Sequence, residues 1–165
     1  MIYIGSDHQG FKLKEKIKVY LDKLGFRYED MGAYKLDKQD DYPDFAKEVC
    51  NKVVGNAHVR SVQNFGILIC GTGIGMSIAA NKLSGIRAAL CCNTESAKSA
   101  REHNNANVLC LSKNADYKNI SSLCSSRTLK SEQSSDYKNI TKAFLDAKFT
   151  KSERHIRRLN KIHNS

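Results

Sequence analysis

The sequence predicts an α/β fold in which helices cover both faces of a five-stranded parallel sheet. Short apolar runs alternate with longer segments of helical periodicity along residues 1–112, which is the order that builds parallel βαβ units. The run 65–69 is apolar throughout, as expected of a strand buried on both faces. With 165 residues, 41% hydrophobic and 27% charged, the chain is long enough to bury the core of one domain.

The first strand is expected at residues 2–5, and a helix follows it. The buried face of this helix is marked by four apolar residues at helical spacing: Leu13, Ile17, Leu21 and Leu24. Ser6 or Asp7 is expected to cap the start of the helix, and Gly25 to end it. Residues 26–31 then form the second strand.

A polar loop at 35–41 leads to a second helix, which opens at Tyr42-Pro43 with proline in its first turn. The third strand, 65–69, ends at Cys70, and an alanine-rich helix is expected from Met76 to Lys82. The remaining elements of this part are a strand at 86–91, a helix at 94–102 capped by Thr94, and a strand at 108–111.

The common strand order 2-1-3-4-5 makes the first and third strands neighbours, and ligands bind where the loops after such strands diverge. One of these loops carries Asp7 and His8, and the other begins at Cys70. His103 and the two asparagines after it precede the fifth strand, so they lie at the amino-terminal end of that strand, whereas both loops follow carboxyl ends. We therefore expect His103 to reach the site from a second subunit.

The segment Cys70-Gly71-Thr72-Gly73-Ile74-Gly75 joins a strand to a helix and predicts an anion site. Glycines allow close approach of the backbone, and the free N–H groups of a helix start attract negative charge. No Lys-Ser/Thr follows the last glycine, so the phosphate-loop pattern is not matched. On spacing alone, a phosphate or oxyanion cradle and a merely tight turn stay equal alternatives. Cys70, at the strand end, faces these amides.

The net charge of +10 is uneven, because residues 1–112 hold 15 Lys/Arg against 12 Asp/Glu and residues 113–165 hold 12 against 5. The basic tail at 154–158 suits nucleic acid or an anionic small molecule, but no aromatic interleaving accompanies it. Arg154 and Arg158 stand one helical turn apart, so both can contact one phosphate. Residues 113–135 read as a low-complexity insertion, followed by helices at 137–147 and after Phe149.

The six cysteines include no C-x-x-C pair, and most lie in apolar runs. Buried free thiols are therefore expected rather than disulfides or a zinc site. The first residues are too short an apolar run for a signal peptide, and no run reaches membrane-span length. We expect a cytoplasmic protein that binds no membrane.

Six segments in order resemble the type B ribose 5-phosphate isomerases, a sugar-phosphate isomerase family that includes the galactose 6-phosphate isomerase subunits. They are G-S-D-H-Q-G (5–10), D-Y-P-D (41–44), C-G-T-G-I-G-M-S-I-A-A-N-K (70–82), G-I-R-A-A-L (85–90), H-N-N-A-N-V-L (103–109) and R-H-I-R-R (154–158). The resemblance implies a Rossmann-like three-layer α/β/α sandwich and metal-free, cofactor-free interconversion of ribose 5-phosphate and ribulose 5-phosphate. It also implies a homodimer, or a dimer of dimers, with active sites at the subunit interface and no nucleic acid partner.

The resemblance assigns the base to Cys70, the enediolate contacts to Thr72 and the amides of 71–75, and opening of the sugar ring to His103 with Asp7. The substrate-binding residues it implies are Asp7, His8, Tyr42, Gly71, Thr72, Gly73, Ile74, Gly75, Asn104, Arg154 and Arg158. It divides the chain into an isomerase domain at 1–149 and a basic helix at 150–165 that completes the phosphate site. The chain departs from the pattern at Asn114, where an arginine is usual, and Lys113 is a candidate substitute.

Two alternatives stay open. The same base and cradle would serve another aldose phosphate, such as galactose 6-phosphate or allose 6-phosphate. A non-catalytic binder of sugar phosphates or nucleic acid is the alternative from a different class, although retention of Cys70 and His103 speaks against it.

Overall fold

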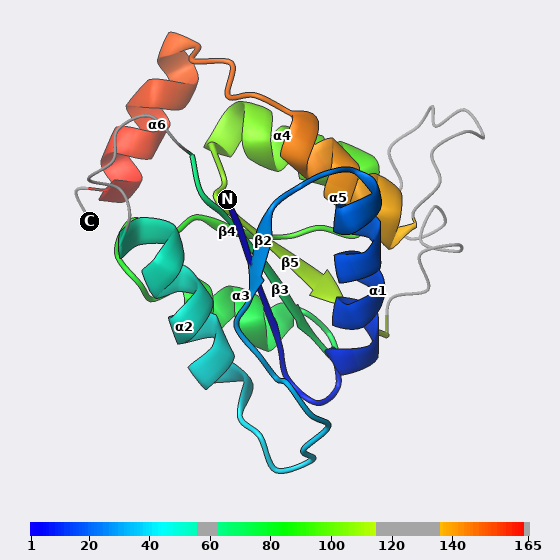
Figure 1. Ribbon diagram of the computed structural model, residues 1–165. Helices are drawn as coiled ribbons and strands as arrows, with labels where there is room; N and C mark the ends of the chain where they lie inside the picture. The colour runs from blue at the N-terminus through cyan, green and yellow to red at the C-terminus, as the bar shows by residue number, and fades with distance from the viewer. Residues whose placement is uncertain (56–62, 115–135, 164–165) are drawn as a thin grey trace.

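The computed structural model describes residues 1–55, 63–114 and 136–163, and in them five parallel strands form one sheet with helices on both faces. This confirms the predicted α/β fold (Figure 1); residues 115–135 of the predicted insertion lie outside the described residues. The strands are β1 (Ile2–Ser6), β2 (Tyr28–Asp30), β3 (Phe65–Cys70), β4 (Ala88–Leu90) and β5 (Val108–Ser112). The helices are α1 (Phe11–Lys23), α2 (Tyr42–Gly55), α3 (Ile74–Asn81), α4 (Thr94–Asn104), α5 (Tyr137–Asp146) and α6 (Glu153–His163).

The strand order is β2-β1-β3-β5-β4, so the predicted order is wrong for its last two strands. β5 takes the inner position because Val108 to Leu111 are fully buried, and only a central strand buries both faces. β2 and β4, at the edges, are shorter than predicted and partly exposed. The predicted contact between β1 and β3 is confirmed, with Ser6 beside Ile69 at their carboxyl ends.

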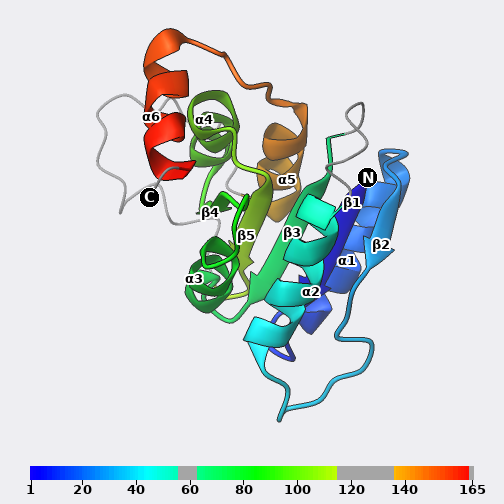
Figure 2. The same cartoon turned by 90° about the vertical axis from the view of Figure 1, so that its left-hand side faces the viewer.

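Two apolar layers hold the helices to the sheet. α1, α4 and α5 cover one face, where Ile17, Leu21 and Phe144 are fully buried, and α2 and α3 cover the other, around Val49 and Met76 (Figures 1 and 2). α6 lies beside α4 in both views, beyond the end of the sheet where β3 begins (Figure 2). The carboxyl ends of the strands therefore stay clear of α6.

The start of α1 and the cap of α4 differ from the prediction. α1 begins at Phe11, and Asp7 Oδ1 instead accepts the Gly10 amide at 2.8 Å, closing the turn before the helix. α4 is capped by Asn93 rather than Thr94, because the extended Asn93 places its Oδ1 2.7 Å from the Ser96 amide. Asp7 is therefore tied to the turn that follows β1, which matters for the site below.

The described cysteines are free thiols, as predicted. Cys50, Cys70, Cys91 and Cys110 are buried and Cys92 is partly exposed, while Cys124 lies outside the described residues. Burial raises the pKa of Cys50 and of Cys91 to about 12. These core thiols therefore stay protonated and unreactive at neutral pH.

Candidate active site

Cys70 is the last residue of β3, and the turn after it aims a backbone amide at its sulfur. The Gly73 N–H donates to Cys70 Sγ over 3.1 Å. Gly73 has a φ of 75°, and a Cβ there would lie 2.5 Å from Leu90 Cδ1 and 3.0 Å from the Leu111 backbone. Only glycine fits this position. The turn thus brings to the sulfur a donor that stabilises a thiolate.

α3 begins at Ile74, two residues earlier than predicted, because Gly73 in its left-handed conformation already ends the turn. The first amides of a helix have no partner within it, so those of Gly75 and Met76 can bind an anion. Tyr42, at the start of α2, packs over this turn: a Cβ on Gly75 would lie 2.8 Å from its ring. Thr72 is exposed, and its Oγ1 lies 3.3 Å from the Ile74 amide. The predicted cradle and Tyr42 therefore lie together.

Asp7 and His8 follow β1 and lie against the end of β3. The Asp7 amide donates to the Ile69 carbonyl at 3.3 Å, and a Cβ on Gly10 would approach that carbonyl oxygen to 2.4 Å. Burial raises the pKa of Asp7, and the Gly10 amide and His8 oppose this rise without cancelling it. A carboxyl whose pKa is moved toward neutrality is better suited to proton transfer.

Asp40 is a residue of this site that the sequence reasoning missed. Its Oδ1 accepts the His8 amide at 3.0 Å and lies 2.6 Å from His8 Nδ1. A carboxylate only accepts, so Nδ1 carries the proton in this pair and Nε2 takes no part in it. The one signal in the sequence was an acidic residue directly before Asp41-Tyr42-Pro43-Asp44.

Lys113 and Asn114 border the same turn. The Lys113 amide donates to the Cys70 carbonyl at 2.9 Å, and the Asn114 amide to the Gly71 carbonyl at 3.0 Å. Lys113 Nζ lies 3.0 Å from Gln9 Oε1, in the turn after β1. This geometry supports the hypothesis that Lys113 supplies the cation for which the family resemblance implies an arginine, and this stays a prediction.

A buried ion pair anchors the end of β1. Lys14 is fully buried, and its Nζ donates to Asp30 Oδ1 at 2.6 Å and to the Ala33 carbonyl at 2.7 Å. The Ala33 amide in turn donates to the Ser6 carbonyl at 2.9 Å. The pair therefore fixes the residue directly before Asp7.

We expect Asp30→Asn to lower the free energy of unfolding at pH 7 by about 3 kcal/mol, because buried Lys14 loses the carboxylate at 2.6 Å and keeps the one of Glu15, which is 3.6 Å away and 44% exposed. Burial raises the pKa of Asp30, but bonds from Lys14, Lys18 and the Gly32 amide outweigh it, so the pKa is lowered. A carboxyl group whose pKa is lowered in the folded state stabilises the fold at pH values above its unfolded-state pKa. This stabilisation is lost as the pH falls from about 4 through the folded-state pKa. Urea unfolding of both proteins from pH 7 down to pH 3 measures the two effects.

Glu29→Gln is the matched control, because Glu29 pairs with Lys52 at 3.1 Å while both side chains are 46% exposed. A surface pair of this kind contributes less than about 1 kcal/mol. Equal losses in the Asp30 and Glu29 variants would contradict the role of the buried pair.

His103, Asn104, Arg154 and Arg158 do not lie beside Cys70 in the described chain. His103 and Asn104 end α4, just before β5, whose Val108 pairs with Gly66 and whose Ser112 pairs with Cys70. Four residues of strand, about 13 Å, separate these two ends of β5. His103 and Asn104 thus lie near the start of β5, at the opposite end of the sheet from Cys70, as predicted.

These four residues instead share a surface built from α4 and α6. The His103 ring lies 4.7 Å from the ring of His155, with the planes tilted by 44°. Arg154 and Arg158 are exposed on α6, one turn apart, on either side of the buried His155 in sequence. The predicted site residues therefore lie in two groups, one at the carboxyl ends of β1 and β3 and one on α4 and α6.

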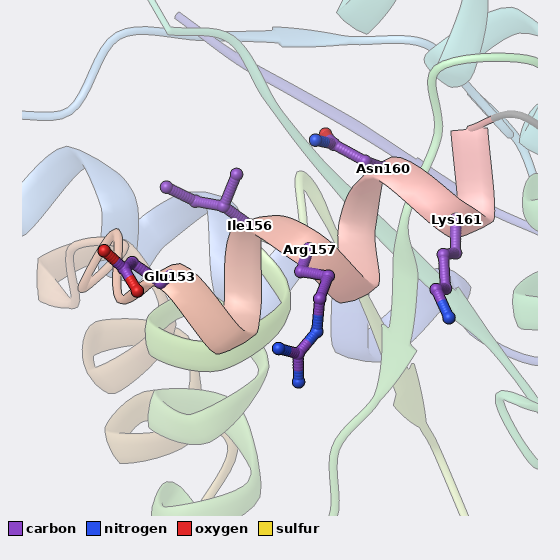
Figure 3. Close-up of a pocket in the computed structure, with 5 residues that line it drawn as sticks. All are labelled: Glu153, Ile156, Arg157, Asn160 and Lys161. Atoms are coloured by element: carbon purple, nitrogen blue, oxygen red, sulfur yellow. The ribbon is translucent and has the colours of Figure 1, made fainter.

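A hollow of about 640 Å³ runs along another side of α6 and contains none of the predicted site residues. Figure 3 shows the described residues that line it: Glu153, Ile156, Arg157, Asn160 and Lys161. The lining residues are three and four positions apart and so lie on one face of α6, which is not the face of Arg154 and Arg158. We therefore do not assign the substrate to this hollow.

The described residues contain neither a cluster of metal ligands nor a membrane-spanning helix. Across 1–55, 63–114 and 136–163, no three or more His, Cys, Asp or Glu side chains are grouped so that they could hold a metal ion. No helix within those ranges is both long and apolar enough to cross a membrane.

Known proteins resemble this chain along nearly its whole length. The family model for Ribose/Galactose Isomerase matches residues 2–162. The chain is 42% identical over 163 residues to a probable ribose-5-phosphate isomerase B of Mycoplasma genitalium, covering 98% of this chain and 92% of the relative. It is also 42% identical over 162 residues to a putative sugar phosphate isomerase of Rickettsia prowazekii, covering 98% and 96%.

Solved structures give the same result. The Mycoplasma genitalium ribose-5-phosphate isomerase B with bound ribulose-5-phosphate superposes with a TM-score of 0.81 at 40% identity, covering 99% of this chain and 93% of that one. The Thermotoga maritima ribose 5-phosphate isomerase gives 0.79 at 42% identity, covering 99% and 97%.

Proposed function

The chain belongs to the ribose/galactose isomerase family, and we propose that it interconverts ribose 5-phosphate and ribulose 5-phosphate with Cys70 as the base. The observation that carries this is the Cys70 sulfur held 3.1 Å from the Gly73 amide, at the start of a helix. The relative solved with ribulose-5-phosphate shares this fold at 40% identity. The comparisons favour neither galactose 6-phosphate, nor allose 6-phosphate, nor a non-catalytic binder.

The reaction moves a proton between two neighbouring carbons of the open-chain sugar. One base must remove the proton from C2 and return it to C1, while the oxygens carry negative charge in the enediolate between them. Cys70 is placed to act as that base from the end of β3. Thr72 and the first amides of α3 supply donors for the enediolate.

The remaining residues divide between ring opening and phosphate binding. Asp7, whose pKa is raised by burial, and His103 act as the acid and base that open the furanose ring. His8, through its Nε2, and the arginines Arg154 and Arg158 hold the phosphate. Phosphate bound there stays away from Cys70, so its charge does not oppose thiolate formation.

We propose that two subunits complete each site, because the predicted site residues form two half-sites at opposite ends of the sheet. The first half-site lies at the carboxyl ends of β1 and β3, and the second lies on α4 and α6. A second copy related by a two-fold axis would bring His103 and the basic helix over the Cys70 turn. Three apolar side chains near this turn support such a contact: Ile74, Ile78 and Leu90 are 53%, 56% and 41% exposed. A homodimer therefore explains both the divided site and the exposed apolar side chains. A cytoplasmic location remains a prediction.

The test of the proposed function is turnover of ribose 5-phosphate by pure, chelator-treated protein. We expect ribulose 5-phosphate to form at a rate that added metal does not change. Galactose 6-phosphate and allose 6-phosphate serve as comparison substrates in the same assay. Preference for either of these, or no turnover of any, would overturn the assignment.

Arg158→Ala is expected to raise KM for ribose 5-phosphate by about tenfold with a smaller change in kcat, because it removes a charged hydrogen bond to the phosphate. Arg157→Ala is the matched control: Arg157 is the neighbouring residue of α6 and lines the hollow of Figure 3. Steady-state kinetics of the two variants measure the difference. Equal KM values in both would clear Arg158 of a phosphate-binding role.

A further inference from the structure

His155 lies at the centre of the second half-site, although the chemistry above gives it no part. Its side chain is 6% exposed, whereas Arg154 and Arg158 on the same helix are exposed. Its ring contacts that of His103, with 4.7 Å between centroids. A buried imidazole thus lies between the proposed ring-opening residue and the proposed phosphate ligands.

The hydrogen bonds around His155 fix which ring nitrogen carries its proton. Thr150 Oγ1 donates its only proton to the Glu102 carbonyl at 2.9 Å. The same oxygen lies 3.0 Å from His155 Nδ1, so it accepts there and Nδ1 donates. His155 Nε2 is then the acceptor, and Arg154 Nε donates to it over 3.2 Å. One chain of bonds links the arginine, through the imidazole and the threonine, to the last turn of α4.

This arrangement requires a neutral imidazole, because a protonated Nε2 has no lone pair for Arg154. Burial lowers the pKa of His155, and the charges of Arg154, His103 and Arg158 lower it further. From α4, Glu102 faces the cluster with its carbonyl, and its carboxylate lies 3.7 Å from Lys98 Nζ. The surroundings therefore favour the form that accepts from Arg154.

We propose that His155 is a positioning residue that aims Arg154 at the phosphate of the substrate and holds it in register with His103, a role that rests on the proposed function. The bond to His155 occupies Arg154 Nε and leaves the two terminal nitrogens for phosphate oxygens. The other end of the bond chain holds Glu102, the neighbour of His103. His155 thereby fixes a phosphate ligand relative to the group that opens the ring.

Two amide variants separate the two hydrogen bonds of His155. In His155→Gln, the amide oxygen takes the place of Nε2 and can still accept from Arg154. In His155→Asn, the amide nitrogen takes the place of Nδ1 and can donate to Thr150, but Arg154 loses its acceptor. We expect inorganic phosphate to bind about tenfold more weakly to His155→Asn and with nearly unchanged affinity to His155→Gln. Calorimetric titration of the full-length assembly measures both.

Combining each change with Arg154→Ala makes the test specific to positioning. If His155 acts through Arg154, adding His155→Asn to Arg154→Ala changes phosphate affinity by less than about twofold, because the group it positions is already gone. A further tenfold loss in the double variant would overturn the proposal. Equal losses in the Gln and Asn single variants would overturn it as well.

Nitrogen NMR of the histidine rings tests the same inference in the unsubstituted protein, where folding of a variant is not at issue. We expect His155 to carry its proton on Nδ1 and to have an unprotonated Nε2 at neutral pH; a protonated Nε2 would overturn the proposal. Phosphate binding that depends on His155 and Arg154, without turnover of ribose 5-phosphate, would refute the proposed function and retain the positioning role.

Discussion

Cys70→Ala is expected to abolish isomerisation while ribose 5-phosphate still binds. Loss of a general base typically lowers turnover by about 10²- to 10⁴-fold, and the alanine removes no phosphate contact. The fold should tolerate the change, because alanine retains the Cβ and the Gly73 amide turns to water or substrate. kcat should therefore fall below detection while the Kd for ribose 5-phosphate, measured by calorimetry, changes by less than about threefold.

Cys92→Ala is the matched control, since among the described cysteines Cys92 is the one that is partly exposed, while the others are buried. It should leave kcat unchanged. A thiol-alkylating reagent should inactivate the unsubstituted enzyme and Cys92→Ala alike, and saturating ribose 5-phosphate should protect both. Turnover near the unsubstituted level in Cys70→Ala would refute the mechanism.

The half-site around Cys70 could be predicted from the sequence because it is built from local signals. A strand that ends in a turn is predicted by the apolar run before Cys70 together with the glycines after it. The apolar residues at the start of the chain predict the first strand in the same way. The contact between β1 and β3 then followed from the commonest α/β arrangement and brought Asp7 to Cys70. The two strand ends could be located from residues close in sequence, and their contact needed only the common strand order.

What the sequence did not reveal depends on pairing between distant residues. Asp40 meets His8 across 32 positions, and nothing periodic marks it. The position of β5 inside the sheet depends on competition between strands for the central place, and the fully apolar Val108 to Leu111 was the overlooked clue. His155 lies between Arg154 and Arg158 in the basic tail, where the sequence indicates only the arginines. Its burial against His103 is what distinguishes it.

Mixing inactive Cys70→Ala with inactive His103→Ala is expected to restore activity. In a mixed dimer, the site that combines the Cys70 of one chain with the His103 of the other is intact, and the second site lacks both. Random exchange makes about half of the dimers mixed, each with one of its two sites whole, so activity should approach about a quarter of the unsubstituted level.

The matched control mixes Cys70→Ala with Asp7→Ala. Both residues belong to the half-site at the β1 and β3 carboxyl ends, where the Asp7 amide bonds to Ile69. Every site in such a mixture lacks one of the two, so no activity should return. This control separates true complementation from stabilisation of one variant by the other.

The outcome depends on where β5 begins. Because Gly66 pairs with Val108, the α4 end that carries His103 lies beside the start of β3, whereas Cys70 lies at its end. A single subunit would have to bridge the length of the sheet to join them. Subunit exchange, verified by native mass spectrometry of differently tagged chains, must precede the assay. If exchange is complete and activity stays at zero, His103 and Cys70 act within one chain, and the proposed two-fold arrangement is wrong.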